Sequence, residues 1–165
     1  FNDLFCLRDH RVHTISIGLE KPQDLDIHLQ AINLLDNSDE LVLKIQHRLE
    51  LAAIDALGSK WLSSCFEGLP SWEETPGQIN IPTLLWLYNL IEAWDMKGYA
   101  KTRYGILGNA GHWFPGNNAD LLDTEISEDV LKESLKASPW VNQIPSILRD
   151  LKNRIGGKPQ RRLWD

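Results

Sequence analysis

The stretch from Asn80 to Gly98 constrains the fold of this chain more than any other part of the sequence. Pro82 suits the first turn of a helix, and Lys97-Gly98 suits a helix C-terminus. Between these ends, apolar side chains occupy nearly every face: Leu84, Leu85, Trp86, Leu87, Tyr88, Leu90 and Ile91. A helix that is apolar all round and too short to cross a bilayer has to be buried. We therefore expect this helix at the centre of the core.

The N-terminal third shows one extended pattern followed by two helical ones. Residues 13–19 alternate polar and apolar side chains, which predicts a short strand or an extended arm. Pro22 opens a stretch in which apolar residues recur at helical spacing. Asn37 and Glu40 have the spacing of a capping box and begin the longest predicted helix. We expect this helix to continue past Gly58, with a bend there.

Helical signals return in the C-terminal third of the sequence. Ser127 is a good N-cap and is followed by acidic residues, which favour a first turn. Pro145 suits the start of a last helix, which Gly156-Gly157 ends. By contrast, residues 98–119 lack helical periodicity and predict a long connection. The sequence therefore predicts a mainly α fold of about five helices with a short N-terminal extended segment or strand.

Composition favours one compact domain. The chain has 165 residues, 42% of them hydrophobic, which is enough for a single core. We assign the domain to 1–157, with 1–21 as an extended arm and 158–165 as a basic, aromatic tail. No apolar run is long enough to span a membrane, and no signal peptide is visible. The first residue is not Met, so we expect a piece of a longer chain or a processed form. Two cysteines, Cys6 and Cys65, are too few for a disulfide framework, which favours the cytoplasm.

Charge is unevenly distributed along this acidic chain. The net charge is −6, and residues 141–165 carry an excess of four positive charges. Residues 1–140 therefore sum to −10. An acidic body does not attract polyanions over its whole surface, so a nucleic-acid contact has to use a local patch.

The segment 97–119 is the strongest candidate for such a patch. It contains three fixed positive charges, no Asp or Glu, and glycines spaced three residues apart. Aromatic rings between the cations could stack on bases while the cations meet phosphates. The alternative is a glycine-rich connection whose aromatic rings pack on the core. The candidate residues for binding an anion or nucleic acid are Lys97, Tyr99, Lys101, Arg103, Tyr104, His112 and Trp113.

A second candidate site lies at the chain start. Arg8 and His13 form an Arg-x4-His pattern, which is similar to the motif of HEPN-type ribonucleases. The resemblance implies an Arg and a His on a helix at a dimer interface, where they cleave RNA without a metal. It covers six residues, and here they stand beside a predicted strand. Cys6, His10 and His13 could also be three zinc ligands, but no second pair at ligand spacing follows. A solvated polar turn is the simplest interpretation, so we expect no metal and no cofactor.

The remaining signals favour a protein that binds other proteins. No motif of a hydrolase, a zinc protease or an EF-hand is present, which favours a non-enzymatic module. Arg161, Arg162 and Trp164 combine cations with a large ring in the tail, as in segments that dock on a partner or on a second copy. We therefore expect a helical protein-interaction or assembly module, with nucleic acid as a further candidate partner. The alternative is a small nuclease or an anion-substrate enzyme that uses Arg8 and His13, or His112 as a general base. Seven tryptophans make the chain tryptophan-rich, and the three on predicted helices are assigned to the core: Trp61, Trp86 and Trp94.

Overall fold

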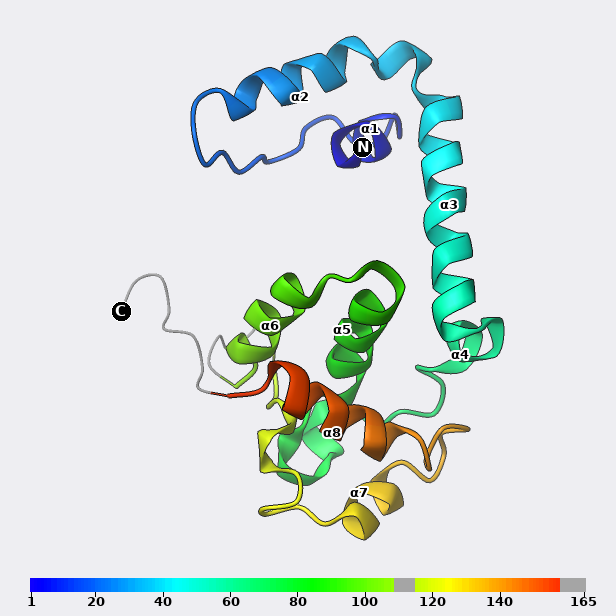
Figure 1. Cartoon of the computed structure of the whole chain (residues 1–165), viewed down its shortest axis with the longest axis vertical. Helices are drawn as coiled ribbons and strands as arrows, with labels where there is room; N and C mark the ends of the chain where they lie inside the picture. The colour runs from blue at the N-terminus through cyan, green and yellow to red at the C-terminus, as the bar shows by residue number, and fades with distance from the viewer. Residues whose placement is uncertain (109–114, 158–165) are drawn as a thin grey trace. The chain divides into compact units, whose positions relative to one another are not determined.

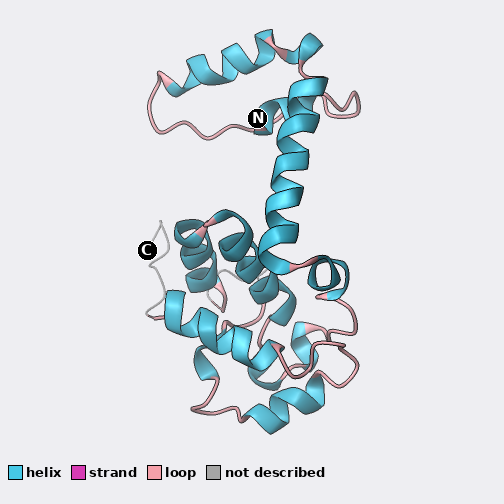
Figure 2. Cartoon of the chain, turned by 45° about the vertical axis from the view of Figure 1, so that its right-hand side comes forward, coloured by secondary structure: helices cyan, strands magenta, loops and turns pink. Residues whose placement is uncertain are grey.

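The computed structural model describes residues 1–108 and 115–157 of the chain. These residues form eight α-helices and no strand, which confirms the mainly α class (Figures 1 and 2). The count exceeds the expected five because the helices at 2–7 and 97–106 were not predicted and the expected long helix divides in two at Gly58. The helices are α1 (Asn2–Leu7), α2 (Asp24–Asn33), α3 (Asp39–Leu57), α4 (Ser59–Ser64), α5 (Ile81–Trp94), α6 (Lys97–Ile106), α7 (Glu128–Ser134) and α8 (Ile144–Ile155).

The chain forms two compact units, which we call the N-terminal unit (Phe1–Leu51) and the C-terminal unit (Ala52–Asp165). A domain has a hydrophobic core of its own. The N-terminal unit buries two large apolar side chains, Leu4 and Val42, whereas the C-terminal unit has an extensive core. Two units are therefore not evidence of two domains. The single domain over 1–157 stays a prediction, and the tail 158–165 lies outside the described residues.

The start of the N-terminal unit differs from the expected extended arm. Residues 2–7 form helix α1, and the expected strand at 13–19 is absent from this fully described unit, since 12–19 have no regular structure. Six residues are too few to show a helical period, which is why the sequence analysis missed α1. A contact with a residue distant in sequence helps to hold this short helix in place. The His28 Nδ1 of α2 lies 2.6 Å from the Asp3 Oδ2 of α1, which ties the two helices together.

The longest helix ends earlier than expected. It begins at Asp39, close to the predicted capping box, but stops at Leu57 instead of bending onward. Gly58 has a φ of +80°, which a continuing right-handed helix does not allow. The chain restarts at Ser59 as the separate helix α4, in which Trp61 is buried.

Helix α5 is the centre of the C-terminal core, as its all-round apolar pattern predicts. The Asn80 side chain caps it by accepting a hydrogen bond from the Thr83 N–H and also donates to the Pro115 carbonyl. The helix ends at Trp94, three residues before the expected Lys97, because Asp95 adopts a left-handed conformation (φ +52°). Helices α6 and α8 pack against α5.

Helix α6 replaces the loop predicted from residue 98 onward. Glycines lower the helix propensity of this segment, and it has no long apolar stripe, so its periodicity is weak. Tertiary packing overrides this weakness, because Ala100 and Tyr104 are fully buried. The Tyr104 hydroxyl donates to Asp120 Oδ1 (2.7 Å) and accepts from the Ala119 N–H (3.2 Å).

The last two helices begin where the sequence predicts. The Ser127 side chain accepts a hydrogen bond from the Val130 N–H at the start of α7. Pro145 lies in the first turn of α8, and Gly156 ends that helix. Charged side chains join α8 to its neighbours. Arg154 of α8 pairs with Glu92 of α5 and with Asp150 one turn back.

Candidate functional site

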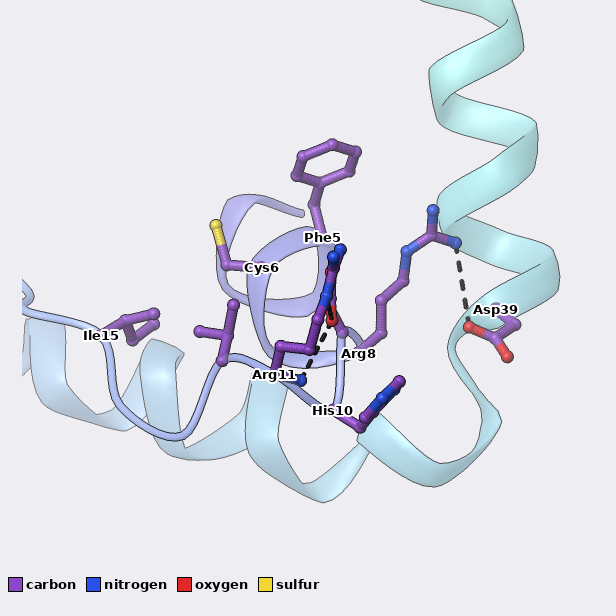
Figure 3. A pocket seen from close by; sticks show the side chains of 9 residues that line it. Phe5, Cys6, Arg8, His10, Arg11, Ile15 and Asp39 are labelled. Carbon is purple, nitrogen blue, oxygen red and sulfur yellow. Dashed lines mark hydrogen bonds and ion pairs between the residues drawn. The ribbon is translucent and has the colours of Figure 1, made fainter.

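A cavity of about 750 Å³ lies in the N-terminal unit (Figure 3). It is formed by the end of α1, by the segment that follows it, and by the first residue of α3. Its lining mixes apolar side chains with charged ones. The lining residues are Phe5, Cys6, Arg8, Asp9, His10, Arg11, Val12, Ile15 and Asp39.

The two arginines of the cavity are matched by two carboxylates. Arg11 Nε lies 2.9 Å from Asp9 Oδ1, and Arg11 Nη2 lies 2.5 Å from Asp9 Oδ2. This hydrogen bonding lowers the pKa of Asp9 to about 2. The Arg8 guanidinium lies over the Phe5 ring, 5.6 Å from its centroid, with Nη1 3.8 Å from Asp39 Oδ1. The fixed charges therefore balance, and the cavity is not an evident trap for polyanions.

The structure does not place Arg8 and His13 as the HEPN resemblance implies. Arg8 is the C-cap residue of α1, whereas His13 stands in the non-helical segment after it. The exposed His13 is not among the residues that line the cavity with Arg8. A shared helical face, which the resemblance implies for the Arg and the His, is therefore missing from this unit. His112 lies outside the described residues, so its role stays a prediction.

The zinc alternative finds no geometric support in the described part of the chain. Cys6 and His10 both line the cavity. However, no three His, Cys, Asp or Glu side chains among residues 1–108 and 115–157 come close enough together to hold a metal ion.

The contact between His28 and Asp3 could not be predicted from the sequence, because the two residues are 25 positions apart and carry no local signal.

The residues predicted to bind an anion divide into three groups. Lys97, Tyr99 and Lys101 are exposed on α6, and Arg103 is half-buried with its guanidinium 5.0 Å from the Tyr99 ring centroid. Tyr104 is fully buried and bonded inside the core, so it offers no surface to a ligand. The remaining candidates lie outside the described residues: His112 and Trp113, and with them the proposed partner-binding residues Arg161, Arg162 and Trp164.

Trp86 joins the exposed residues of α6, although the sequence analysis assigned it to the core. Trp86 is 36% exposed, and its ring meets the Tyr99 ring edge to face, with centroids 6.1 Å apart and planes at 89°. Trp94 is also exposed, whereas Trp61 is buried as expected. A helix that is apolar on all sides gives no periodic signal for the face that stays open.

The N-terminal unit exposes most of its large apolar side chains. Thirteen of them are open to solvent, against two that are buried. The exposed set is Phe1, Phe5, Ile17, Leu19, Leu25, Ile27, Leu29, Ile32, Leu34, Leu41, Leu43, Leu49 and Leu51. Where such side chains are contiguous, as along one side of a helix, they mark an interaction site.

The described residues contain no helix that combines the length and the apolar character needed to cross a membrane. Neither a protein-family model, nor a curated protein, nor a solved structure matches this chain, so any function has to be argued from its own geometry.

Proposed function

We propose that this chain is a non-enzymatic protein-interaction module and that its N-terminal unit binds a partner protein. One observation carries the proposal: the thirteen exposed apolar side chains of that unit. Burial of apolar surface is the main favourable term in protein association. The N-terminal unit leaves most of its Leu and Ile side chains exposed to water. Burying them against a partner would therefore contribute favourable free energy of association.

Helix α2 offers the clearest docking face within the unit. Leu25, Leu29 and Ile32 follow one another at intervals of four and three residues, so they lie on one side of the helix. All three are exposed, at 41%, 49% and 53%. An apolar stripe with this spacing is the feature that an amphipathic helix uses to enter a groove on another protein.

Charge indicates a different protein as the occupant rather than a second copy of this chain. The N-terminal unit carries nine acidic and five basic residues, a net charge of −4 with neutral histidines. Two copies facing each other through this unit would bring like charges together, which opposes association. A partner with an apolar groove and a basic rim would bind through burial of the apolar side chains and through attraction between opposite charges.

The experiment compares the full chain with a variant in its docking face. Leu29→Ser combined with Ile32→Ser removes the α2 stripe, and Val130→Ser is the matched control because Val130 is an exposed apolar residue of α7. Each protein serves as bait in an extract, and a captured protein is then purified and titrated against all three. We expect the double variant to lose at least tenfold in affinity, since truncated anchors cost more than 1 kcal/mol each, while the control binds like the unaltered chain.

Sedimentation of the purified chain shows separately whether the docking face is occupied by a different protein or by a second copy of this chain. A monomer that forms a complex with the captured protein is the expected result. Self-association that the double variant abolishes would show that the occupant is a second copy. Equal binding of the captured protein by all three baits would overturn the docking face itself.

A further inference from the structure

We propose that the outer face of α6, together with Trp86 of α5, binds single-stranded nucleic acid. We call this set the α6 surface: Lys97, Tyr99, Lys101, Arg103 and Trp86. It lies wholly within the C-terminal unit and does not depend on the apolar surface of the N-terminal unit.

The charge of α6 suits a polyanion. The helix carries three fixed positive charges and no acidic residue. Lys97 and Lys101 are one turn apart and exposed, and neither forms an ion pair with another residue of the described chain. The nearest acid in the sequence is Asp95, which ends α5 before this helix begins.

Four other cations in the described part of this unit are paired with carboxylates. The cations paired with carboxylates are Lys132, Lys136, Arg149 and Arg154. Lys152 donates instead to the Leu122 carbonyl. Lys60 is also exposed and lies over the Trp140 ring, so among the described residues of this unit α6 is distinguished by two neighbouring lysines outside any ion pair. Unpaired lysines on a surface are the groups that phosphates attract, with release of counterions.

Two aromatic rings of the α6 surface are held in place beside the cations. Tyr99 is 39% exposed and held between two partners, the Arg103 guanidinium over its ring and Trp86 at its edge. These contacts hold the two rings at right angles to each other, and both residues remain partly exposed. Fixed, partly exposed rings beside cations form a platform on which unpaired bases stack.

The lysines and the Tyr99–Arg103 pair occupy different sides of the helix. With 3.6 residues per turn, Lys97 and Lys101 lie along one flank of α6, and Tyr99 and Arg103 lie along the other. The two flanks are about half a turn apart; on one side between them Gly98 is exposed and Thr102 is half-buried, and on the other side Ala100 and Tyr104 are buried. A nucleotide likewise has its charge on one edge and its ring on the other.

Small residues fill the space between the two flanks. Gly98 has open space where a side chain would project, and the Thr102 hydroxyl folds back onto the Gly98 carbonyl (3.2 Å). The flanks are therefore separated by a low ridge about 10 Å wide, the diameter of a helix. A single strand of nucleic acid could lie across this ridge, with its phosphates at Lys97 and Lys101 and its bases at the rings of Tyr99 and Trp86.

The chemistry of the exposed groups favours nucleic acid over an acidic peptide. Eleven of the thirteen exposed apolar residues of the N-terminal unit are Leu or Ile, which suit a protein groove. The α6 surface presents a Tyr and a Trp instead, and flat rings bind bases of any sequence. A duplex keeps its bases stacked inside, so the rings select for a single strand.

The experiment titrates the full chain with a labelled oligothymidylate of about 20 nucleotides, a length that exceeds typical single-module sites. A duplex and a poly-glutamate peptide of the same length are the competing probes. Lys97→Ala with Lys101→Ala removes one flank, and Tyr99→Ala removes the other. Lys132→Ala with Lys136→Ala is the control, because it changes the net charge equally at a different surface.

We expect the oligothymidylate to bind more tightly than either competing probe. The α6 lysine variant should bind about tenfold more weakly, and its log–log salt slope should fall by about 1.4, the value for two lost phosphate contacts. Tyr99→Ala should weaken binding about tenfold without a change in salt slope, and Tyr99→Phe should restore it, since stacking needs only the ring. The control should match the unaltered chain.

Three results would overturn the proposal. The first is no binding of the oligothymidylate at low salt, and the second is unchanged binding by folded lysine and Tyr99→Ala variants. The third is equal or tighter binding of poly-glutamate, which would identify the α6 surface as a contact for acidic proteins. Far-UV circular dichroism of each variant shows whether the fold is retained, and Tyr99→Leu tests the ring if the alanine variant unfolds, since Leu keeps an apolar side chain but cannot stack on a base.

Discussion

Tyr104 shows how one side chain can have opposite roles in sequence and structure. In the sequence it stands among cations and suggests a ring for a ligand. In the structure it is fully buried, and its hydroxyl joins α6 to the segment before α7 through Asp120 and Ala119. Burial, and then the hydrogen bond to Asp120, raise the pKa of Tyr104 well above its ordinary value near 10.

The substitution Tyr104→Phe tests this structural role. The variant keeps the ring but leaves the Asp120 carboxylate without its donor and the Ala119 N–H without its acceptor, so it should lose about 2–3 kcal/mol of unfolding free energy near pH 7. The raised pKa means that folding favours the neutral phenol. The stabilisation of the folded state by the Tyr104 hydroxyl is therefore complete below pH 10. It is lost as the pH rises further, because Tyr104 then ionises in the unfolded chain. Urea denaturation at several pH values should show the two proteins converging above pH 10, and a gap that widens there would contradict the assignment.

At the scale of elements, α5 is the helix on which the C-terminal core depends. Leu87, at its middle, is fully buried. Leu87→Ala should cost about 2–5 kcal/mol, because the cavity adds to the lost transfer free energy. Val130→Ala, at an exposed site of α7, should change stability by less than about 0.5 kcal/mol. Chemical denaturation measures both, and a loss below 1 kcal/mol for Leu87→Ala would place α5 at the periphery.

Helix α8 depends on charge as well as on packing. Arg149 binds Asp123 and Glu128 with N–O distances of 2.8 Å. Its hydrogen bond lowers the pKa of Asp123, and the hydrogen bonds of Lys132 and then Arg149 lower the pKa of Glu128. A lowered pKa in the folded state stabilises the protein above the unfolded pKa, near pH 4, and this contribution is lost as the pH falls. Arg149→Gln should therefore be less stable than the unaltered chain at pH 7 and indistinguishable from it near pH 2.

The strength of local signals explains which elements could be predicted. Helix α5 and the start of α7 followed from apolar density and from the Ser127 cap. Helices α1 and α6 did not, because the first is six residues long and the second has glycines where a stripe would be. The cations of the α6 surface were predicted from composition alone. Trp86 could not be, since its exposure depends on how other helices cover α5.

At the scale of the whole molecule, stability is unevenly distributed along the chain. The buried core cluster draws its residues from 61–155, whereas the N-terminal unit has almost no core of its own. Regions with few buried apolar contacts open at low free energy, while core elements open only with global unfolding. All seven tryptophans belong to the C-terminal unit, so tryptophan fluorescence reports on that unit alone.

Two probes should therefore disagree when the isolated chain is denatured. Far-UV circular dichroism should lose part of its helical signal at low urea, as α1 and α2 unfold, before tryptophan emission changes. Both signals should then fall together in one cooperative transition of the C-terminal core. A chain that lacks residues 1–38 is the control and should show the second transition alone, at nearly the same midpoint. Coincident curves for the full chain would mean that the exposed apolar residues of the N-terminal unit are stabilised without a partner, which would weaken the case for a docking surface there.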